Sequence, residues 1–286
     1  MLLRFDGEDN YIIARSDKMD KIVGFIGCGN MASAMIGGIV NSGLLPKERI
    51  VASNRSREKL EKVHNKYGIN TANDNKEVAD HSDILVLSVK PNMYSSVVDE
   101  IKNAVKENII VVSIAPGISI KDMQNMFEKD IKVVRAMPNT PALVGEGMSA
   151  LCPSANVSKE ELLDVMNIFE SFGKAEVVDE KLIDAVVAVS GSSPAYVYIF
   201  IEAMADAAVL EGMPRDKAYR FAAQAVLGSA KMVLETGLHP GKLKDMVCSP
   251  EGTTIEAVAT LEDMGFRSAV ISAMKSCTEK SRKMAK

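Results

Sequence analysis

The stretch Gly27-Cys28-Gly29-Asn30-Met31-Ala32 decides the fold, because it fits the pattern G-x-G-x-x-A at the end of an apolar run, Ile22–Gly27. Such a run is typical of a buried strand, and the residues after it read as a helix. In this context the first glycine allows a tight turn, the second lets the backbone approach a pyrophosphate, and the alanine allows close packing of helix on strand. Free N–H groups at the start of a helix favour phosphate. The stretch therefore predicts dinucleotide binding by residues 27–32 rather than a plain strand–helix turn.

The residues around this turn alternate short apolar runs with amphipathic helical patterns, such as Arg57–Tyr67, which ends at Gly68. Another helix begins with the capping-box pair Ser158 and Glu161 and is expected to stop at Gly173. This alternation predicts an α/β fold, with a Rossmann-type, doubly wound parallel sheet and helices on both of its faces. The predicted strands are Ile22–Gly27, Ile50–Asn54, Ile84–Val89, Ile109–Ile114, Lys132–Ala136, Gly147–Pro153 and Lys174–Asp179.

Beyond about Glu180 the strand pattern ends and only helical patterns follow. Small residues occupy nearly every face of the long helices, and a helix that is apolar almost all round must be covered on all sides. We therefore expect a partner subunit to interleave with this part, in a homodimer or a higher homo-oligomer. The predicted domains are 19–179, which binds the dinucleotide, and 180–286, an all-helical dimerisation and substrate domain. The predicted helices of the second domain are Leu182–Val189, Ser193–Gly212, Arg215–Thr236, Lys242–Val247, Thr254–Met264 and Arg267–Lys283.

The composition excludes several classes of protein. With 47% hydrophobic and 25% charged residues, the chain of 286 residues is globular and long enough for two domains. Residues 1–18 mix charges with apolar residues, so we expect a leader outside the fold. A net charge of −4 favours neither nucleic acid nor an anionic membrane as a partner, and no apolar run approaches the roughly 20 residues of a membrane span. The cysteines form no CxxC motif, which favours reduced thiols in a cytoplasmic protein.

The end of the second strand indicates which dinucleotide binds. Enzymes that use NAD usually place an acidic residue there to hold the ribose 2′-hydroxyl. Here the strand ends Ser53-Asn54-Arg55-Ser56-Arg57, with two arginines and no acid. Because guanidinium groups bind phosphate well, we expect NADPH as the preferred cofactor, with NADH possible. The alternative is that these arginines form an ordinary solvated helix start.

The sequence offers few groups for acid–base chemistry. His64 lies in a charged helix and His81 in a polar turn, so we expect both at the surface, and no metal-ligand motif is present. Hydride transfer needs no strong protein base, and a protonated imine is a suitable electrophile for it. Two loops, 189–194 and 248–254, precede helices and carry free N–H groups and hydroxyls. They are either helix-capping loops or a cradle for a small carboxylate.

Several motifs together resemble those of the pyrroline-5-carboxylate reductase family, from about Lys21 to the C-terminus. Besides the glycine turn, they are Val89-Lys90-Pro91, Arg135-Ala136-Met137-Pro138-Asn139-Thr140-Pro141, Ser190-Gly191-Ser192-Ser193-Pro194-Ala195-Tyr196, His239-Pro240 and Ser249-Pro250-Glu251-Gly252-Thr253-Thr254-Ile255. The resemblance implies reduction of 1-pyrroline-5-carboxylate to L-proline, the last step of proline biosynthesis, in active sites that draw on two subunits.

The resemblance also implies roles for single residues. Ser53 and Arg55 would lie near the adenosine ribose and its phosphate, and Asn139 near the nicotinamide. The backbone of loop 249–254 would hold the substrate carboxylate, and the Thr254 hydroxyl would act as the catalytic group at the ring nitrogen. The rest of the cofactor path would be lined by Asn75, Val89, Lys90, Pro91, Ala115 and Pro116. The family usually has Gly at the positions of Ser193 and Glu251, and Ala at that of Pro116.

Two other functions fit parts of the sequence. A hydroxyacid dehydrogenase has a similar two-domain plan but usually carries a catalytic Lys on the helix after the second-domain glycine loop, and residues 195–202 contain none. A non-catalytic NADP-binding protein would share the glycine turn but would not need a carboxylate cradle. Reduction of an imine is the function that we expect.

Overall fold

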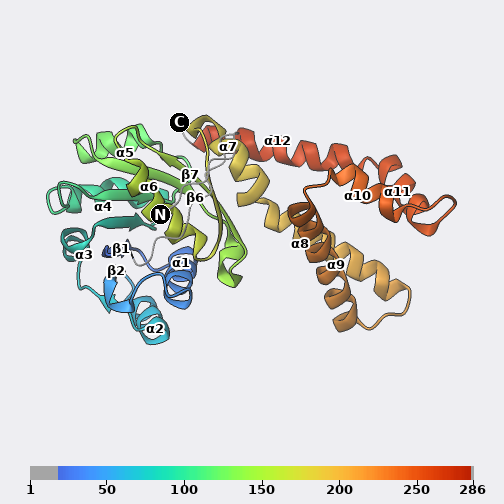
Figure 1. The fold of residues 1–286 in the computed structure, drawn as a ribbon, viewed down its shortest axis with the longest axis horizontal. Coiled ribbons are helices and arrows are strands. Elements are labelled where there is room, and N and C mark those ends of the chain that lie inside the picture. The colour runs from blue at the N-terminus through green and yellow to red at the C-terminus, as the bar shows by residue number, and fades with distance from the viewer. Residues whose placement is uncertain (1–18, 285–286) are drawn as a thin grey trace, which may run out of the picture. The chain divides into compact units, whose positions relative to one another are not determined.

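The computed structural model describes residues 19–284, so the predicted leader, 1–18, lies outside the described residues. The described chain divides into two compact units. The first, the sheet unit, comprises residues 19–191 and 279–284, and the second, the helical unit, comprises Ser192–Thr278 (Figure 1). The predicted boundary between residues 179 and 180 thus falls inside the sheet unit, a few turns before the chain enters the helical unit.

The sheet unit contains one eight-stranded sheet in the order β3-β2-β1-β4-β5-β6-β7-β8. The six neighbouring strands from β3 to β6 in this order are parallel, which is the doubly wound arrangement that the sequence predicts. The strands are β1 (Val23–Ile26), β2 (Ile50–Ser53), β3 (Asn70–Thr71), β4 (Ile84–Leu87), β5 (Ile110–Ser113), β6 (Lys132–Met137), β7 (Gly147–Pro153) and β8 (Gly173–Val177).

Two features of the sheet differ from the sequence-based prediction. Strand β7 pairs antiparallel with β6, so the sheet is mixed and not wholly parallel. The segment between Met137 and Gly147 is too short for the crossover of a dozen or more residues that a parallel neighbour requires. Strand β3 was missed, because its two residues are exposed and carry no apolar run.

Six helices cover the two faces of this sheet. Helices α1 (Asn30–Asn41), α2 (Arg57–Tyr67) and α6 (Lys159–Glu170) bury their apolar side chains on one face. Helices α3 (Asn75–His81), α4 (Tyr94–Ile101) and α5 (Ile120–Phe127) bury theirs on the other. The predicted ends of α2 and the capping box of α6 are confirmed, but α6 stops at Glu170, since Gly173 already begins β8.

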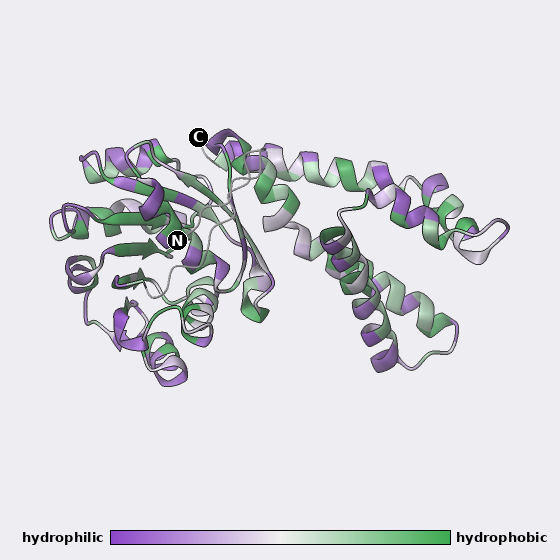
Figure 2. Cartoon of the chain, in the orientation of Figure 1, coloured by the Kyte–Doolittle hydropathy of each residue, from purple (hydrophilic) through white to green (hydrophobic). Residues whose placement is uncertain are grey.

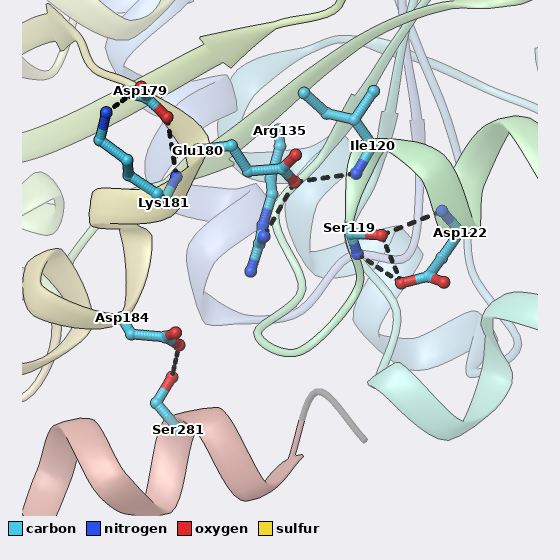
Figure 3. Close-up of polar contacts among 9 residues, drawn as sticks. All are labelled: Ser119, Ile120, Asp122, Arg135, Asp179, Glu180, Lys181, Asp184 and Ser281. Atoms are coloured by element: carbon cyan, nitrogen blue, oxygen red, sulfur yellow. Dashed lines mark hydrogen bonds and ion pairs between the residues drawn. The ribbon is translucent and has the colours of Figure 1, made fainter.

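Beyond β8, a set of polar contacts holds the chain against the sheet (Figure 3). Oε1 of Glu180 accepts a hydrogen bond from Nη1 of Arg135 and another from the Ile120 N–H, each over 2.9 Å. A turn later, Asp184 accepts a hydrogen bond from the Ser281 hydroxyl over 2.6 Å. These contacts explain why residues 279–284 belong to the sheet unit although they end the chain.

The predicted helix Leu182–Val189 is three short turns in the structure. They are η4 (Glu180–Leu182), α7 (Ile183–Val186) and η5 (Val187–Gly191), of types 3₁₀, α and π. Helices of the 3₁₀ and π types occur in short pieces and often mark functional places in a chain. Here they form the segment through which the chain leaves the sheet unit.

The helical unit contains the other predicted helices, with ends shifted by no more than two residues. They are α8 (Ser193–Leu210), α9 (Arg215–Thr236), α10 (Pro240–Val247), α11 (Thr253–Asp263) and α12 (Phe266–Met284), the last of which extends into residues 279–284. In one copy of the chain, the buried apolar side chains of residues 192–278 are Ala205, Ala218 and Ala222. Large apolar side chains such as Phe221 and Leu234 are 68% and 82% exposed, and green apolar positions recur along all these helices in Figure 2. Such helices need a cover that one copy does not supply.

Within residues 19–284, the segment Glu180–Leu210 is long enough to cross a membrane and contains an 18-residue window with a mean hydropathy of 1.4. The sequence-based expectation that no run approaches this length is therefore wrong, because it takes 189–194 as a loop, whereas helical turns of η5 and α8 lie on either side of Ser192. Length and composition alone are weak evidence for a membrane span, since the core helix of a water-soluble protein has the same properties. The ion pair of Glu180 with Arg135 holds the start of this segment on the sheet.

Candidate active site

The glycine turn has the geometry that the motif predicts. Gly27 has a φ of +101°, and a Cβ there would lie 2.8 Å from the carbonyl oxygen of Ser88, so only glycine fits. A Cβ on Gly29 would meet nothing within 4 Å, so open space lies in front of this residue. Gly29 is the N-cap of α1 and makes no side-chain cap, which leaves the first N–H groups of the helix available to an anion. Ala32 is fully buried against the core, where the motif needs a small residue.

Two side chains brace this turn from within the protein. The Cys28 N–H donates to Oδ1 of Asn54 over 3.0 Å, and the Asn54 amide donates in turn to the Ser56 carbonyl over 2.9 Å. The Ser88 hydroxyl donates to the Gly27 carbonyl over 2.7 Å. Burial raises the pKa of the Cys28 thiol to about 11, so this cysteine stays protonated and acts as a packing residue. Asn54 therefore shapes the turn, and Ser88 is a contributor that the motif alone did not identify.

The predicted cofactor residues lie at the carboxyl ends of neighbouring parallel strands. Ser53 ends β2, Val89 follows β4 by two residues, and Ala115 follows β5 by two residues. Parallel strands place their carboxyl ends at one edge of the sheet, where ligands of doubly wound folds bind. Lys90 and Pro91 are exposed there, and Pro116 is half-buried. Met31 and Asn30 belong to the first turn of α1 at the same edge.

The end of β2 carries both a buried and an exposed group. Ser53 is only 2% exposed and donates its hydroxyl to Oδ1 of Asn75 over 2.7 Å, so it orients Asn75 instead of facing solvent. Arg55 is exposed and makes no hydrogen bond or ion pair within residues 19–284. Arg57 lies 3.9 Å from Glu61, one turn along α2. The Arg55 guanidinium group is thus free to bind an anion from outside the protein.

Asn139 is buried, and both ends of its amide are bonded to the backbone of the sheet unit. Its Nδ2 donates to the Ser190 carbonyl over 3.0 Å, and its Oδ1 accepts from the Met148 N–H over 2.9 Å. The side chain therefore ties the segment η5 to the turn between β6 and β7. The sequence-based interpretation of Asn139 as a neighbour of the nicotinamide did not include this structural role.

The loop Ser249–Gly252 forms a tight turn at the start of α11. The Gly252 N–H donates to the Ser249 carbonyl over 3.1 Å, with Pro250 and Glu251 as the central residues. Glu251 has a φ of +57°, the conformation that the third position of a type II turn requires and that favours glycine. A Cβ on Gly252 would lie 2.3 Å from the Ser249 hydroxyl and 3.1 Å from the Ser249 carbonyl oxygen, so a larger residue there would make the Ser249 side chain move. The sequence thus builds a tight, mostly exposed turn in front of a helix whose N-cap makes no side-chain hydrogen bond.

Thr254 is the second residue of α11, because the helix begins at Thr253 and its N-cap is Gly252. The cap makes no side-chain hydrogen bond, and within residues 19–284 the Thr254 hydroxyl has none either. A role for the Thr254 hydroxyl as the helix cap, the alternative to a catalytic role, therefore finds no support in the geometry. Thr254 is half-buried, and its hydroxyl has no partner within residues 19–284 that would compete with a ligand.

The histidines are accounted for by the fold. His64 and His81 are exposed, as predicted, and each bonds a nearby backbone carbonyl through Nδ1. His239 caps α10, since its Nδ1 accepts from the Gly241 N–H over 3.0 Å, which explains the His239-Pro240 pair as a helix start. No group of three potential ligands from His, Cys, Asp and Glu comes together in the described part of the chain.

A pocket of about 790 Å³ lies elsewhere on the sheet unit, beside β7, β8 and the start of α5. Its walls include Asp130, Asp179 and Glu180, together with Cys152, whose pKa burial raises to about 12. None of the predicted site residues lines it. The predicted cofactor residues lie instead at the carboxyl ends of the strands in the sheet unit, and the predicted substrate loop 249–254 belongs to the helical unit.

Comparison with known proteins agrees with both parts of the chain. A family model described as pyrroline-5-carboxylate reductase dimerisation matches residues 180–284, and one described as NADP oxidoreductase, coenzyme F420-dependent, matches residues 22–117. The pyrroline-5-carboxylate reductase of Escherichia coli is 55% identical over 268 residues, which are 94% of this chain and 100% of that protein.

Solved structures agree in fold as well. A pyrroline-5-carboxylate reductase from Coxiella burnetii aligns with a TM-score of 0.88 at 34% identity, over 93% of this chain and 99% of that one. A pyrroline carboxylate reductase from Plasmodium falciparum, solved with NADP bound, aligns with a TM-score of 0.85 at 35% identity, over the same shares. With full-length identity of this level and a dimerisation region of the same kind, the chain belongs to the pyrroline-5-carboxylate reductase family of oxidoreductases.

Proposed function

We propose that this chain reduces 1-pyrroline-5-carboxylate to L-proline, the last step of proline biosynthesis, with NADPH as the preferred hydride donor and NADH as a second one. The observation that carries the proposal is the 55% identity to the Escherichia coli reductase over that protein's whole length. A hydroxyacid dehydrogenase or a non-catalytic NADP-binding protein is not supported by an identity of this extent.

The residues at the sheet edge fit a dinucleotide. The open space in front of Gly29 and the uncapped N–H groups of α1 suit a pyrophosphate. The residues that would hold the cofactor are Gly27, Cys28, Gly29, Asn30, Met31, Ala32, Ser53, Asn54, Arg55, Asn75, Val89, Lys90, Pro91, Ala115, Pro116 and Asn139. Reduced nicotinamide supplies a hydride, so the protein itself needs only to bind, orient and protonate.

The preference for NADPH rests on charge at the end of β2. No acidic residue follows Ser53 directly, and Arg55 is exposed with no partner among the described residues. A guanidinium group binds a 2′-phosphate by two parallel hydrogen bonds, which a ribose hydroxyl does not allow. NADH lacks this phosphate and keeps the remaining contacts, so it binds more weakly but still serves.

The substrate carboxylate suits the turn that precedes α11. The remaining backbone N–H groups of residues 249–254, which exclude Pro250 (no N–H) and Gly252 (bonded to Ser249), attract an anion together with the start of the helix, without a basic side chain. The unpaired hydroxyl of Thr254 then hydrogen-bonds the ring nitrogen, which ends the reaction protonated. This assignment makes Thr254 the catalytic residue and Ser249, Pro250, Glu251, Gly252, Thr253 and Thr254 the substrate-binding set.

The active protein is a homodimer or a higher homo-oligomer in which the helices of residues 180–284 interleave. The exposed apolar side chains of α8 and α9 support this, as does the dimerisation model that matches this region. Sedimentation at assay concentrations should give no monomer with full activity. We place the enzyme in the cytoplasm, because its four cysteines are all free thiols.

The direct test follows absorbance while the protein is mixed with NADPH and 1-pyrroline-5-carboxylate. The expected result is oxidation of NADPH with formation of L-proline, at a higher kcat/KM for NADPH than for NADH. A 2-ketoacid in place of the imine is the control for the dehydrogenase alternative. Turnover of the ketoacid but not of the imine would overturn the proposal, and binding of NADPH without turnover of either would leave the non-catalytic alternative in its place.

A further inference from the structure

Asn75 joins three elements of the sheet unit at the corner where β2 ends. Its Oδ1 accepts a hydrogen bond from the Ser53 hydroxyl over 2.7 Å. Its Nδ2 donates to Oε2 of Glu100, in the last turn of α4, over 2.7 Å as well. Ser53 is buried, Asn75 is half-buried and Glu100 is exposed, so the three side chains run from the core to the surface.

The chemistry of Glu100 fixes the direction of these hydrogen bonds. An ionised carboxylate only accepts, so the amide of Asn75 must turn its nitrogen toward Glu100 and its oxygen toward Ser53. The Ser53 hydroxyl then has to donate its proton to that oxygen. Glu100 thereby sets the orientation of Asn75, which is one of the residues that we assign to the cofactor path.

The carboxylate also changes the charge at this corner. The end of β2 shows two arginines and no acid, which is the pattern behind the expected NADPH preference. Glu100 supplies an acid from a different element, 25 residues beyond Asn75 in the sequence. Its negative charge is opposite to that of Arg55, and a carboxylate repels phosphate and accepts hydrogen bonds, as a ribose hydroxyl requires.

We propose that Glu100 is a specificity-determining residue, which through its contact with Asn75 lowers the advantage of NADPH over NADH. The proposal rests on the proposed cofactor function. In it, the positive charge of Arg55 favours binding of the 2′-phosphate, and the negative charge of Glu100 opposes that preference. The enzyme then accepts both reduced dinucleotides, with a preference set by two opposed charges.

The test measures binding of nucleotides that differ by one phosphate. Dissociation constants for adenosine 2′,5′-bisphosphate and 5′-AMP are determined by calorimetry, together with those for NADPH and NADH, on the wild-type protein and on Glu100→Gln. Glu107→Gln is the matched control, because Glu107 is also exposed and precedes β5, whose amino end lies at the opposite edge of the sheet. Both variants lose one negative charge, so a difference between them reports position and not net charge.

We expect Glu100→Gln to tighten the 2′-phosphorylated ligands by roughly two- to five-fold relative to their unphosphorylated partners, the fold-change typical of an exposed charge. The gain should shrink as salt is added, because salt screens exposed charges. An equal change for both ligands of a pair, or the same gain in Glu107→Gln, would overturn the proposal. If the wild-type protein binds neither dinucleotide, the proposed function itself fails, an outcome that is visible before any variant is made.

Discussion

Asn139 donates a hydrogen bond from Nδ2 to the carbonyl oxygen of Ser190 over 3.0 Å, and this contact joins two motifs that lie 51 residues apart. The acceptor belongs to the π turn Val187–Gly191, in which the regular helical bonds are interrupted. On its other side, Asn139 accepts from the Met148 N–H. The amide thus holds the exit segment of the sheet unit at a fixed place beside the predicted cofactor edge.

Replacing Asn139 by Asp tests this role. The carboxylate of Asp still accepts from the Met148 N–H, but it places an oxygen against the Ser190 carbonyl oxygen. We therefore expect a loss of about 1.5 kcal/mol or more in the local stability of residues 187–191. Their backbone amides should then exchange hydrogen at least ten-fold faster. The Met148 N–H should remain protected from hydrogen exchange in this variant. Asn139→Ala, which removes both contacts, should speed hydrogen exchange both in residues 187–191 and at the Met148 N–H. A fall in NADPH affinity with unchanged exchange would instead assign the side chain to the nicotinamide.

The glycine turn and the parallel strands could be predicted from the sequence, because both depend on local patterns. The roles of Gly27, Gly29 and Ala32 follow from the sequence immediately around them. The apolar runs match the observed strands within one or two residues. The antiparallel direction of β7 depends on the length of a connection and not on the pattern of the strand itself. The alternation of strand and helix patterns, which predicts parallel strands, therefore could not predict the direction of β7.

Parts of the site that depend on distant residues could not be predicted. Glu100 reaches Asn75 from another helix, and Asn139 reaches Ser190 across the unit, so no motif contains either pair. The strain at Glu251 is a mixed case, because the family resemblance implies Gly at this position, while the reason for it, the positive φ, required the backbone.

Arg55→Asp should weaken NADPH much more than NADH. The change puts a like charge beside the 2′-phosphate and removes a charge-assisted contact worth roughly 1.5–3 kcal/mol, which is about ten- to a hundred-fold in affinity. Direct titration of both cofactors measures this. Arg57→Asp is the comparison, since Arg57 already lies near Glu61. An equal loss for NADPH and NADH would show that Arg55 does not bind the phosphate.

Asp83 should make part of the stability depend on pH. Burial raises the pKa of its carboxyl, but hydrogen bonds from Lys106 and from the Ile22 N–H, each 2.8 Å long, outweigh burial and leave the pKa below its usual value. A lowered folded-state pKa means that the stabilisation is present above the unfolded pKa and is lost as pH falls through the folded one.

The variant Asp83→Asn should therefore unfold more easily than wild type at neutral pH, by about 1 kcal/mol after allowance for partial exposure. The two proteins should converge in acid, where wild type is protonated. Urea titrations at several pH values compare them. Glu58→Gln is the control, because its exposed pair with Lys62 should leave stability nearly unchanged. A constant gap between wild type and Asp83→Asn down to acid pH would contradict the assignment.

Glu251→Gly should relieve strain in the substrate loop. The left-handed conformation of Glu251 costs a non-glycine residue about 1–2 kcal/mol, part of which is offset by the greater entropy of unfolded glycine, so we expect a gain of about 0.5–1 kcal/mol. The thermal midpoint at fixed protein concentration measures it. Glu251→Ala keeps a Cβ and should give no such gain. Both variants should lower KM for the imine, since both remove a carboxylate beside the substrate's own.

Thr254→Ala tests the catalytic assignment. The hydroxyl lies on the second residue of α11, is half-buried and has no hydrogen-bond partner within residues 19–284. Because Gly252 and not Thr254 is the helix cap, its loss should change the melting temperature little, whereas a lost N-cap costs about 1 kcal/mol. A hydrogen bond to the ring nitrogen that strengthens in the transition state should lower kcat by roughly ten- to a thousand-fold.

Three measurements on the same preparations separate catalysis from structure at this position. NADPH affinity should stay the same in Thr254→Ala, because the residue belongs to the substrate loop. Thr254→Ser keeps the hydroxyl and should restore most of kcat, while Thr253→Ala, which removes the exposed hydroxyl one residue earlier, should leave kcat near normal. If Thr254→Ala turns over at a near-normal rate but melts earlier, the hydroxyl serves the fold of the loop, and the proton at the ring nitrogen must come from another donor.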